Sequence, residues 1–194
     1  YTPHNGWAEQ KPEDWRDAAL ETITKVVKDS GVAADDIKGL GISGQMHGLV
    51  MLDEQGEVIR PSIIWCDQRT EKECEEMTEK VGAEKLIEIT ANPAMTGFTA
   101  SKILWVRNNE PENYAKCKHI LLPKDYVRYI LTGEFATEVS DASGMQLLDV
   151  PKRQWSDELL EILDIDKSLL AKVYESPEVT GTILPEIAAK TGLS

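Results

Sequence analysis

The sequence predicts an α/β domain, and three features support that class. Apolar residues recur at helical spacing between residues 12 and 30. Apolar runs typical of strands lie on both sides of a glycine-rich turn between residues 36 and 53, and further helical patterns occupy much of residues 68–131. Helical segments interleaved with a modest set of strands are typical of a domain in which helices cover a sheet.

The first predicted helix covers residues 12–30. Pro12 stands in the first turn, where its missing N–H does no harm, and Glu13 and Asp14 suit the positive end of the helix dipole. Gly31 suits the C-terminal cap, because glycine adopts the left-handed conformation found there. The apolar stripe of this helix consists of Trp15, Ala19, Ile23, Val26 and Val27.

Three strands are predicted after this helix. Residues 36–43, "DIKGLGIS", have the composition of a buried strand, and residues 48–53 form its neighbour. A turn at residues 53–56 leads into a third strand over residues 57–65. Pro61 marks an irregular point in that strand, because proline cannot donate to a strand ladder.

The remainder of the chain is predicted to be mainly helical. Helices are expected at residues 68–81, 83–89, 99–109 and 123–131. A short extended segment at residues 133–141 leads into a turn. After Pro151, short helices are expected at residues 156–163, 166–173 and 184–191.

The composition argues against nucleic acid and membranes as partners. The 194 residues carry a formal net charge of −13, and no cluster of lysine and arginine is longer than Lys152-Arg153, so the surface repels phosphate backbones. No run approaches the roughly 18 apolar residues of a membrane-spanning helix. Cys66, Cys74 and Cys117 form no CxxC pair, so we expect no disulfide framework and no zinc site, but reduced thiols in the cytoplasm.

Several common catalytic motifs are absent from the sequence. There is no GxxxxGK[ST] or GxGxxG nucleotide cradle, no HExxH zinc motif and no GxSxG nucleophile elbow. The chain opens at Tyr1 without a methionine or a signal-like apolar region, and it closes within a helical pattern. We therefore expect the chain to be part of a longer protein.

The turn Gly44-Gln45-Met46-His47-Gly48 is the first candidate site. Its glycines allow a sharp turn and a close approach to a ligand. The imidazole can donate and accept hydrogen bonds, which suits a polyhydroxylated substrate, and the methionine can cover an apolar face. The alternative is a hairpin that carries a surface histidine.

The segment "IIWCDQRT", residues 63–70, is the second candidate site. Trp65 ends an apolar strand and is followed by polar residues, an arrangement that can hold the C–H face of a sugar on the indole and bond its hydroxyls. The alternative is a core tryptophan followed by a helix with Asp67 as its N-cap.

Two further segments have a structural interpretation from the residues alone. Residues 97–109 have the pattern of a surface helix that packs through Ile103, Trp105 and Val106, with Lys102 in solvent. Asp141, between two serines, could act as a general base, but the same residues suit a turn or a helix cap.

Taken together, these segments resemble the FGGY family of carbohydrate kinases over nearly the whole chain. The opening "GWAEQKPEDW" resembles a family segment with two tryptophans. The turn "GISGQMHGLVMLD" is similar to the sugar-binding turn of the members that act on xylulose. "GFTASKILWVRNN" matches the family pattern of a lysine three residues before a tryptophan, and "LLPKDYVRYILTGEFATEVSDASG" and "LLDVPKRQWSDELL" continue the resemblance.

The resemblance implies roles for individual residues. Met46 and His47 would bind D-xylulose or a related ketose, and Trp65 would line the same cleft. Asp67 and Phe98 are candidates only through their position near that cleft. Asp141 does not match the catalytic base of the family, which the resemblance places beyond Ser194, so no catalytic residue and no metal ligand is expected within residues 1–194.

The resemblance also implies a fold and missing parts. The fold would be the ribonuclease-H-like half of an actin-like ATPase, an incomplete N-terminal domain over residues 1–194 without its first strands and phosphate loop. The ATP-binding domain of the same full-length chain would supply ATP and Mg²⁺, and it would close over the sugar to exclude water. An unpaired sheet edge would also permit a homodimer.

Three functions remain open at this point. The chain could belong to a kinase that converts D-xylulose to D-xylulose 5-phosphate, or to a family member acting on ribulose, gluconate or glycerol. It could also be a non-catalytic sugar-binding module of the same fold. The Gln45-Met46-His47 sequence favours the first function.

Overall fold

The computed structural model describes residues 1–194 and contains nine α-helices and eight short strands. The helices are α1 (Pro12–Ser30), α2 (Glu71–Val81), α3 (Ala83–Thr90), α4 (Thr99–Asn109), α5 (Pro111–Lys116), α6 (Pro123–Thr132), α7 (Val139–Ser143), α8 (Asp157–Leu163) and α9 (Pro185–Thr191). Two single 3₁₀ turns are η1 (Ala34–Asp36) and η2 (Lys167–Leu169). The strands are β1 (Glu9–Gln10), β2 (Val50–Leu52), β3 (Ser62–Ile63), β4 (His119–Leu121), β5 (Ala136–Glu138), β6 (Leu148–Asp149), β7 (Gln154–Trp155) and β8 (Lys172–Tyr174).

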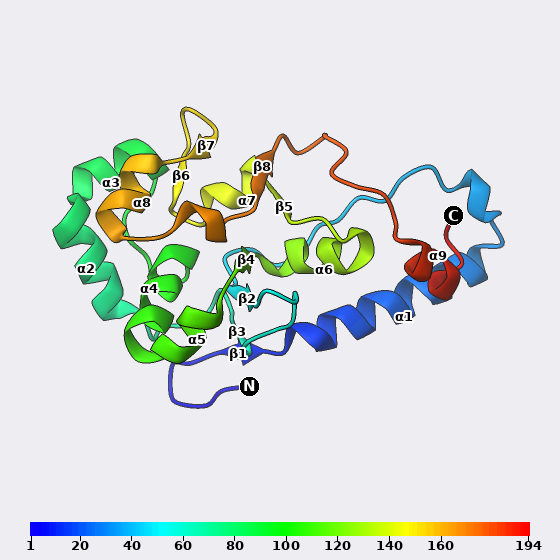
Figure 1. Ribbon diagram of the computed structural model, residues 1–194, viewed down its shortest axis with the longest axis horizontal. Coiled ribbons are helices and arrows are strands. Elements are labelled where there is room, and N and C mark those ends of the chain that lie inside the picture. Colours follow the sequence, from blue (N-terminus) through cyan, green and yellow to red (C-terminus); the bar gives the residue numbers. More distant parts are fainter.

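The strands form short ladders in the middle of the molecule (Figure 1). β1 pairs with β3 and β2 pairs with β4, both antiparallel. An antiparallel bridge between Leu49 and Ile63 joins these two pairs, so the central strands follow the order β1-β3-β2-β4. β5 pairs with β8 in parallel, and β6 pairs with β7 antiparallel. The α/β class expected from the sequence is therefore confirmed.

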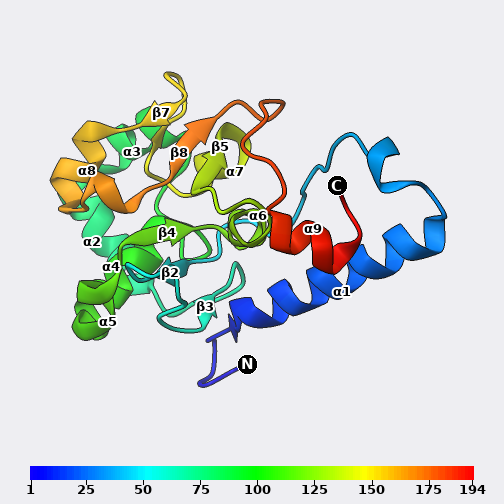
Figure 2. The same cartoon turned by 45° about the vertical axis from the view of Figure 1, so that its right-hand side comes forward.

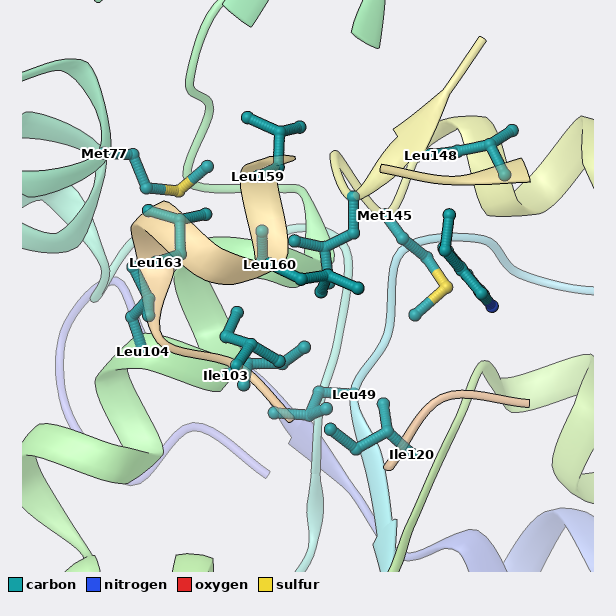
Figure 3. Packing of buried hydrophobic residues seen from close by; sticks show 14 of the residues in the cluster. Leu49, Met77, Ile103, Leu104, Ile120, Met145, Leu148, Leu159, Leu160 and Leu163 are labelled. Atoms are coloured by element: carbon teal, nitrogen blue, oxygen red, sulfur yellow. The ribbon is translucent and has the colours of Figure 1, made fainter. Parts of the chain in front are cut away.

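The main hydrophobic core lies on one side of these strands. It contains 24 buried residues, including Leu49 and Ile120 from the central strands and Ile103 and Leu104 from α4. Figure 3 shows the α8 leucines and Met77 of α2 packed against the same group. Burial of this much apolar surface is the main driving force for folding the end of the molecule that holds α2, α3, α4, α5 and α8.

Helix α1 has the predicted bounds and extends away from that core. It begins at Pro12, and Gly31 ends it with a φ of 65°, the left-handed cap expected from the sequence. A second cluster joins Leu20 of α1 to Leu131 of α6 and Ile187 of α9. Both views show α9 lying against α1 at the end of the molecule opposite α2 and α3 (Figures 1 and 2).

The strand predicted at residues 36–43 is absent, so that prediction was wrong. No backbone N–H between residues 38 and 47 donates a hydrogen bond, and Leu40 is 44% exposed. The segment is extended, but no neighbouring strand lies beside it, and a strand is defined by its ladder partner. Its apolar side chains instead border a groove of about 410 Å³ between α1 and α6.

Other segments also differ from the sequence-based expectations. Of residues 57–65, only Ser62–Ile63 form a strand, with a bridge from Val58 to Leu52. Residues 166–173 form η2 and the start of β8 instead of a helix, because β8 pairs with β5. Helix α5 was not predicted. The remaining predicted helices lie within a few residues of their expected bounds.

Helix α4 has the predicted bounds, but it is not a surface helix. Every residue from Thr99 to Val106 is buried. Lys102, which was expected in solvent, is 0% exposed, and its Nζ donates to the carbonyl oxygens of His47 at 2.8 Å and Gly97 at 2.6 Å. Burial lowers the pKa of Lys102 to about 7, although Asp67 and Cys66 act in the opposite direction.

A buried arginine joins β1, the loop after β3 and helix α4. The Arg69 guanidinium lies 3.8 Å from the ring centre of Trp7 and 4.9 Å from that of Trp105. It donates to Glu9 at 2.8 Å and to Asp67 at 2.8 Å. Its charge is therefore offset by two carboxylates and by two aromatic faces, which makes the buried cation tolerable.

We expect Arg69→Met to lower the free energy of unfolding by about 3–5 kcal/mol, because Asp67 and Glu9 would remain buried without their shared partner. Urea denaturation would measure this loss. Arg153→Met is the matched control, since Arg153 pairs with Glu175 at the surface and its removal should leave the free energy of unfolding nearly unchanged. Similar losses in both variants would contradict the structural role of Arg69.

We also expect Lys102 to make stability depend on pH. Because its folded pKa of about 7 lies below the ordinary lysine value of 10.5, the unfolded chain holds a proton that the folded chain has released between these values. The free energy of unfolding should therefore rise with pH above 7, by at most about 1.4 kcal/mol per pH unit. Lys102→Met should abolish this rise between pH 7.5 and 8.5, measured by urea denaturation.

That pH window separates Lys102 from the other shifted groups. The pKa of Asp125 is raised to about 6 by burial, so it titrates below the window. Burial raises the pKa of Cys117 to about 12 from 9.0, and its effect, which has the opposite sign, begins above the window. Lys85→Met, at an exposed lysine, is the control, and an identical slope in both variants would contradict the prediction.

Candidate functional site

The turn at residues 44–48 places the His47 ring between Phe98 and Gly144. His47 has a φ of 64°, an uncommon value for a residue with a side chain. Gly48 lies so close to Pro123 that an added Cβ would come within 2.5 Å of the proline Cγ. Only glycine fits there, and this close packing fixes the path of the chain directly after His47.

The His47 ring is half-buried and held on two sides. Its Nδ1 lies 3.1 Å from the carbonyl oxygen of Gly144, and its ring centre lies 4.3 Å from that of Phe98. An added Cβ on Gly144 would come within 2.2 Å of the His47 Cε1, so glycine is required on the far side of the ring as well. The alternative of a surface histidine in a hairpin is therefore wrong.

The environment of His47 favours a neutral ring. Burial lowers its pKa below the ordinary value of 6.5, against the opposing effect of the Gly144 hydrogen bond, and nearby Lys102 lowers it further. Because a carbonyl can only accept, Nδ1 must carry the proton of the neutral ring. Nε2 then has a free lone pair and no partner within the protein, so it can accept a hydrogen bond from a ligand hydroxyl.

Trp65 and Phe98 belong to two loops that pack against each other. An added Cβ on Gly97 would come within 2.9 Å of the Trp65 carbonyl oxygen, and Thr96 donates to Gln68 at 3.0 Å. Trp65 is 55% exposed, so the alternative of a core tryptophan is wrong. Its indole presents an apolar face to solvent close to the loop that carries Phe98.

Met46 completes the exposed apolar group of the site. It is 48% exposed, directly before His47, while Phe98 is half-buried beneath the histidine ring. The structure therefore brings His47 and Phe98 together, with the Trp65 loop packed against the loop that carries Phe98, and Met46 lies beside His47 in the chain. Such a surface combines a hydrogen-bonding ring with apolar faces, which is the chemistry that holds a polyol.

Asp67 is not part of this surface. It is 0% exposed, and its carboxylate accepts from the backbone N–H of Ala8 at 2.5 Å and from the side chain and backbone of Arg69. The expectation that Asp67 contacts a sugar has no support in this geometry, because its oxygens are already occupied. Nor is it a helix N-cap, since α2 begins at Glu71. Its carboxylate anchors the loop that carries Trp65.

Asp141 lies in an ion-pair cluster beside the site. Lys124 bonds both Glu138 at 2.5 Å and Asp141 at 2.9 Å. Although burial opposes ionisation, hydrogen bonds from Lys124, Ser176 and the first backbone N–H groups of α7 lower the pKa of Glu138 to about 2. Glu138 is thus the cap of α7, and Asp141 lies in its first turn. This geometry supports the structural interpretation of Asp141.

The chain offers no metal site of its own. No three His, Cys, Asp or Glu side chains gather where they could hold a metal ion by themselves. No helix combines the length and apolar character needed to cross a membrane.

Three residues of the site were missed by sequence reasoning. Lys102 and Thr99 both donate to the carbonyl oxygen of His47, at 2.8 Å and 3.1 Å, and Gly144 supports the ring. The lysine three residues before a tryptophan was noted only as part of a family pattern. Contacts such as these, between residues about 50 or 100 positions apart, follow from no local signal.

Comparison with known proteins assigns the chain to a family. The model of the N-terminal domain of the FGGY family of carbohydrate kinases matches residues 1–194. The xylulose kinase of Bacillus subtilis (strain 168) is 45% identical over 188 residues, which cover 97% of this chain and 38% of the relative. The xylulose kinase of Escherichia coli (strain K12) is 44% identical over 192 residues, which cover 99% of this chain and 39% of the relative. The chain thus spans less than half the length of these relatives.

Solved structures agree with this assignment. A "xyloylose kinase" from Brucella ovis has a TM-score of 0.90 at 37% identity, covering 100% of this chain and 40% of that chain. A gluconate kinase from Lactobacillus acidophilus has a TM-score of 0.92 at 27% identity, and the match covers 100% of this chain and 39% of that chain. These matches confirm the actin-like ATPase fold expected from the sequence. Because the family model matches all 194 residues and these relatives cover nearly all of them, the chain belongs to the FGGY family of carbohydrate kinases.

Proposed function

We propose that these residues form the sugar-binding part of an ATP-dependent kinase that converts D-xylulose to D-xylulose 5-phosphate. The observation that carries the proposal is the position of the His47 ring, whose Nδ1 is held by the Gly144 carbonyl and whose Nε2 has no partner within the protein. The xylulose kinases among its relatives support the choice of sugar.

The chemistry of a ketose suits this surface. Sugar hydroxyls both donate and accept, so one of them can donate to Nε2 of His47. The C–H face of the sugar is apolar and can lie against Met46, Phe98 or the exposed Trp65 indole. A ring with a fixed tautomer selects a hydroxyl at one position, because a misplaced hydroxyl would leave the half-buried acceptor unpaired.

The phosphoryl-transfer step would use groups outside these 194 residues. Transfer from ATP to a primary hydroxyl depends on alignment and on neutralisation of the phosphate charge. We propose that ATP and a divalent metal ion bind to the part of the protein that corresponds to the rest of the relatives' length. The same part would supply the base that accepts the hydroxyl proton. The role of the described residues is then to hold the ketose in line and to shield one side of it from water.

A second candidate substrate class follows from one structural match. The gluconate kinase of Lactobacillus acidophilus has a TM-score of 0.92 to this chain. A panel of D-xylulose, D-ribulose, gluconate and glycerol would separate the alternatives. The full-length protein containing these residues should release ADP in a coupled assay with D-xylulose at the highest kcat/KM. A preference for gluconate would make gluconate the substrate in place of D-xylulose. If no sugar is phosphorylated, the protein is a non-catalytic sugar-binding module.

We expect His47→Ala in the full-length protein to raise the KM for D-xylulose at least about tenfold, because one or two hydrogen bonds to the ketose are lost. Steady-state kinetics at saturating ATP would measure the change. His119→Asn is the control. His119 lies in β4 and stacks on Phe135, so its substitution should leave the KM for D-xylulose unaltered. Unchanged KM and kcat in His47→Ala would remove His47 from the sugar site.

Trp65 should report ketose binding by fluorescence. Because its indole is 55% exposed, a bound sugar would change its contact with water and alter its emission. We expect Trp65→Phe to remove most of the D-xylulose-dependent change, although the chain has five tryptophans. Trp15→Phe, in α1, should retain it. A full signal in Trp65→Phe would place the responsive indole elsewhere.

A further inference from the structure

The Lys102 side chain is buried without a carboxylate partner. It is 0% exposed, and its Nζ makes no ion pair within 4.0 Å. Such burial is unfavourable for a cation, because it removes the hydration of the charge without a compensating ion. An apolar residue at this position of α4 would avoid that cost. The position of the amine therefore calls for an explanation beyond packing.

The two carbonyl groups that Lys102 binds belong to different loops of the site. One is the carbonyl of His47, in the turn with the left-handed residue, where Thr99 donates as well. The other is the carbonyl of Gly97, directly before Phe98 and packed against the backbone of Trp65. One nitrogen thus joins the loop that carries the imidazole to the loop that carries the aromatic ring beneath it.

We infer that Lys102 is the positioning residue of the ketose site, holding His47 at a fixed distance and angle from Phe98 and the Trp65 loop through the carbonyls of His47 and Gly97. The inference rests on the proposed sugar-binding function. Lys102 itself touches no sugar, because its amine points into the protein toward these two carbonyls.

Loss of the amine would affect binding of the ketose more than the fold of the domain. Without it, the His47 carbonyl keeps only the Thr99 bond, and the Gly97 carbonyl loses its bond to Lys102. The positive-φ turn could then relax, and the ring would leave its contact with Phe98. The Nε2 acceptor would then be misplaced for the ketose hydroxyl, which weakens binding of the sugar.

The test compares Lys102→Met with wild type in the full-length protein. Methionine keeps the length and packing of the side chain but has no donor. We expect the KM for D-xylulose to rise at least about tenfold, with the KM for ATP and the kcat at saturating ketose within about threefold of wild type. Thr99→Val, which removes only the second donor to the His47 carbonyl, should shift the KM in the same direction by a smaller factor.

Two controls separate positioning from general destabilisation. Lys85→Met removes an exposed lysine of α3 and should leave all kinetic constants unaltered. A merely structural role for Lys102 would lower the active fraction and the kcat but leave the KM for D-xylulose as in wild type, and that outcome would overturn the inference. If Lys102→Met does not fold, Lys102→Gln, which keeps one donor, takes its place and should give an intermediate KM.

A measurement without substrate separates this inference from the proposed function. The His47 ring protons should show a ring-current shift from Phe98, whose ring centre is 4.3 Å away, and ¹³C-labelled histidine makes the signal visible by NMR. We expect the shift to collapse in Lys102→Met and to persist in Lys85→Met. A preserved shift would overturn the inference whatever the enzyme's activity. A collapsed shift in a protein that phosphorylates no sugar would reject the proposed function alone.

Discussion

Burial of residues Thr99–Val106 of helix α4 constrains the arrangement of both the core and the candidate site. This buried stretch must place its apolar residues in the core and find partners for its polar ones. Ile103 and Leu104 enter the main core, whereas Thr99 and Lys102 donate to the carbonyl of His47. The turn that carries His47 is thus attached to a buried helix, which is the arrangement that a precise binding site needs.

Buried charge is used in two different ways around this helix. Arg69 is enclosed by Glu9, Asp67 and two tryptophan rings, so its charge is balanced and the loop of Trp65 is anchored. Lys102 donates only to carbonyl oxygens, and burial moves its pKa to about 7. The first arrangement stabilises the fold. The burial of Lys102 reduces stability but holds two loops of the site in position. A local loss of stability of this kind is common at functional sites.

The candidate site is less acidic than the composition of the whole chain suggests. A net charge of −13 disfavours phosphate groups over most of the surface, yet the site itself presents a neutral imidazole and apolar side chains. The carboxylates closest to it are occupied: Asp67 by Arg69, and Glu138 and Asp141 by Lys124. The described surface therefore suits an uncharged polyol better than an anion.

Local signals in the sequence were sufficient for the helices whose ends carry proline and glycine. Pro12 and Gly31 mark α1, because these residues act on the backbone directly and need no distant partner. The turn around His47 was also visible, since two glycines flank a polar ring. The resemblance to the FGGY family likewise predicted the fold from the sequence.

Contacts between distant segments decided the rest. The predicted strand at residues 36–43 failed because a strand needs a neighbour, and sequence alone does not reveal whether one is present. Asp67 lay next to a candidate tryptophan in sequence, but its carboxylate faces Arg69 and Ala8. Lys102 was expected in solvent. Nothing in residues 97–109 indicates that its amine donates to the carbonyl of His47, which is 55 positions away. Local sequence determined where the helices and turns begin and end, whereas tertiary structure decided which polar groups are buried together, because burial depends on what packs against each element.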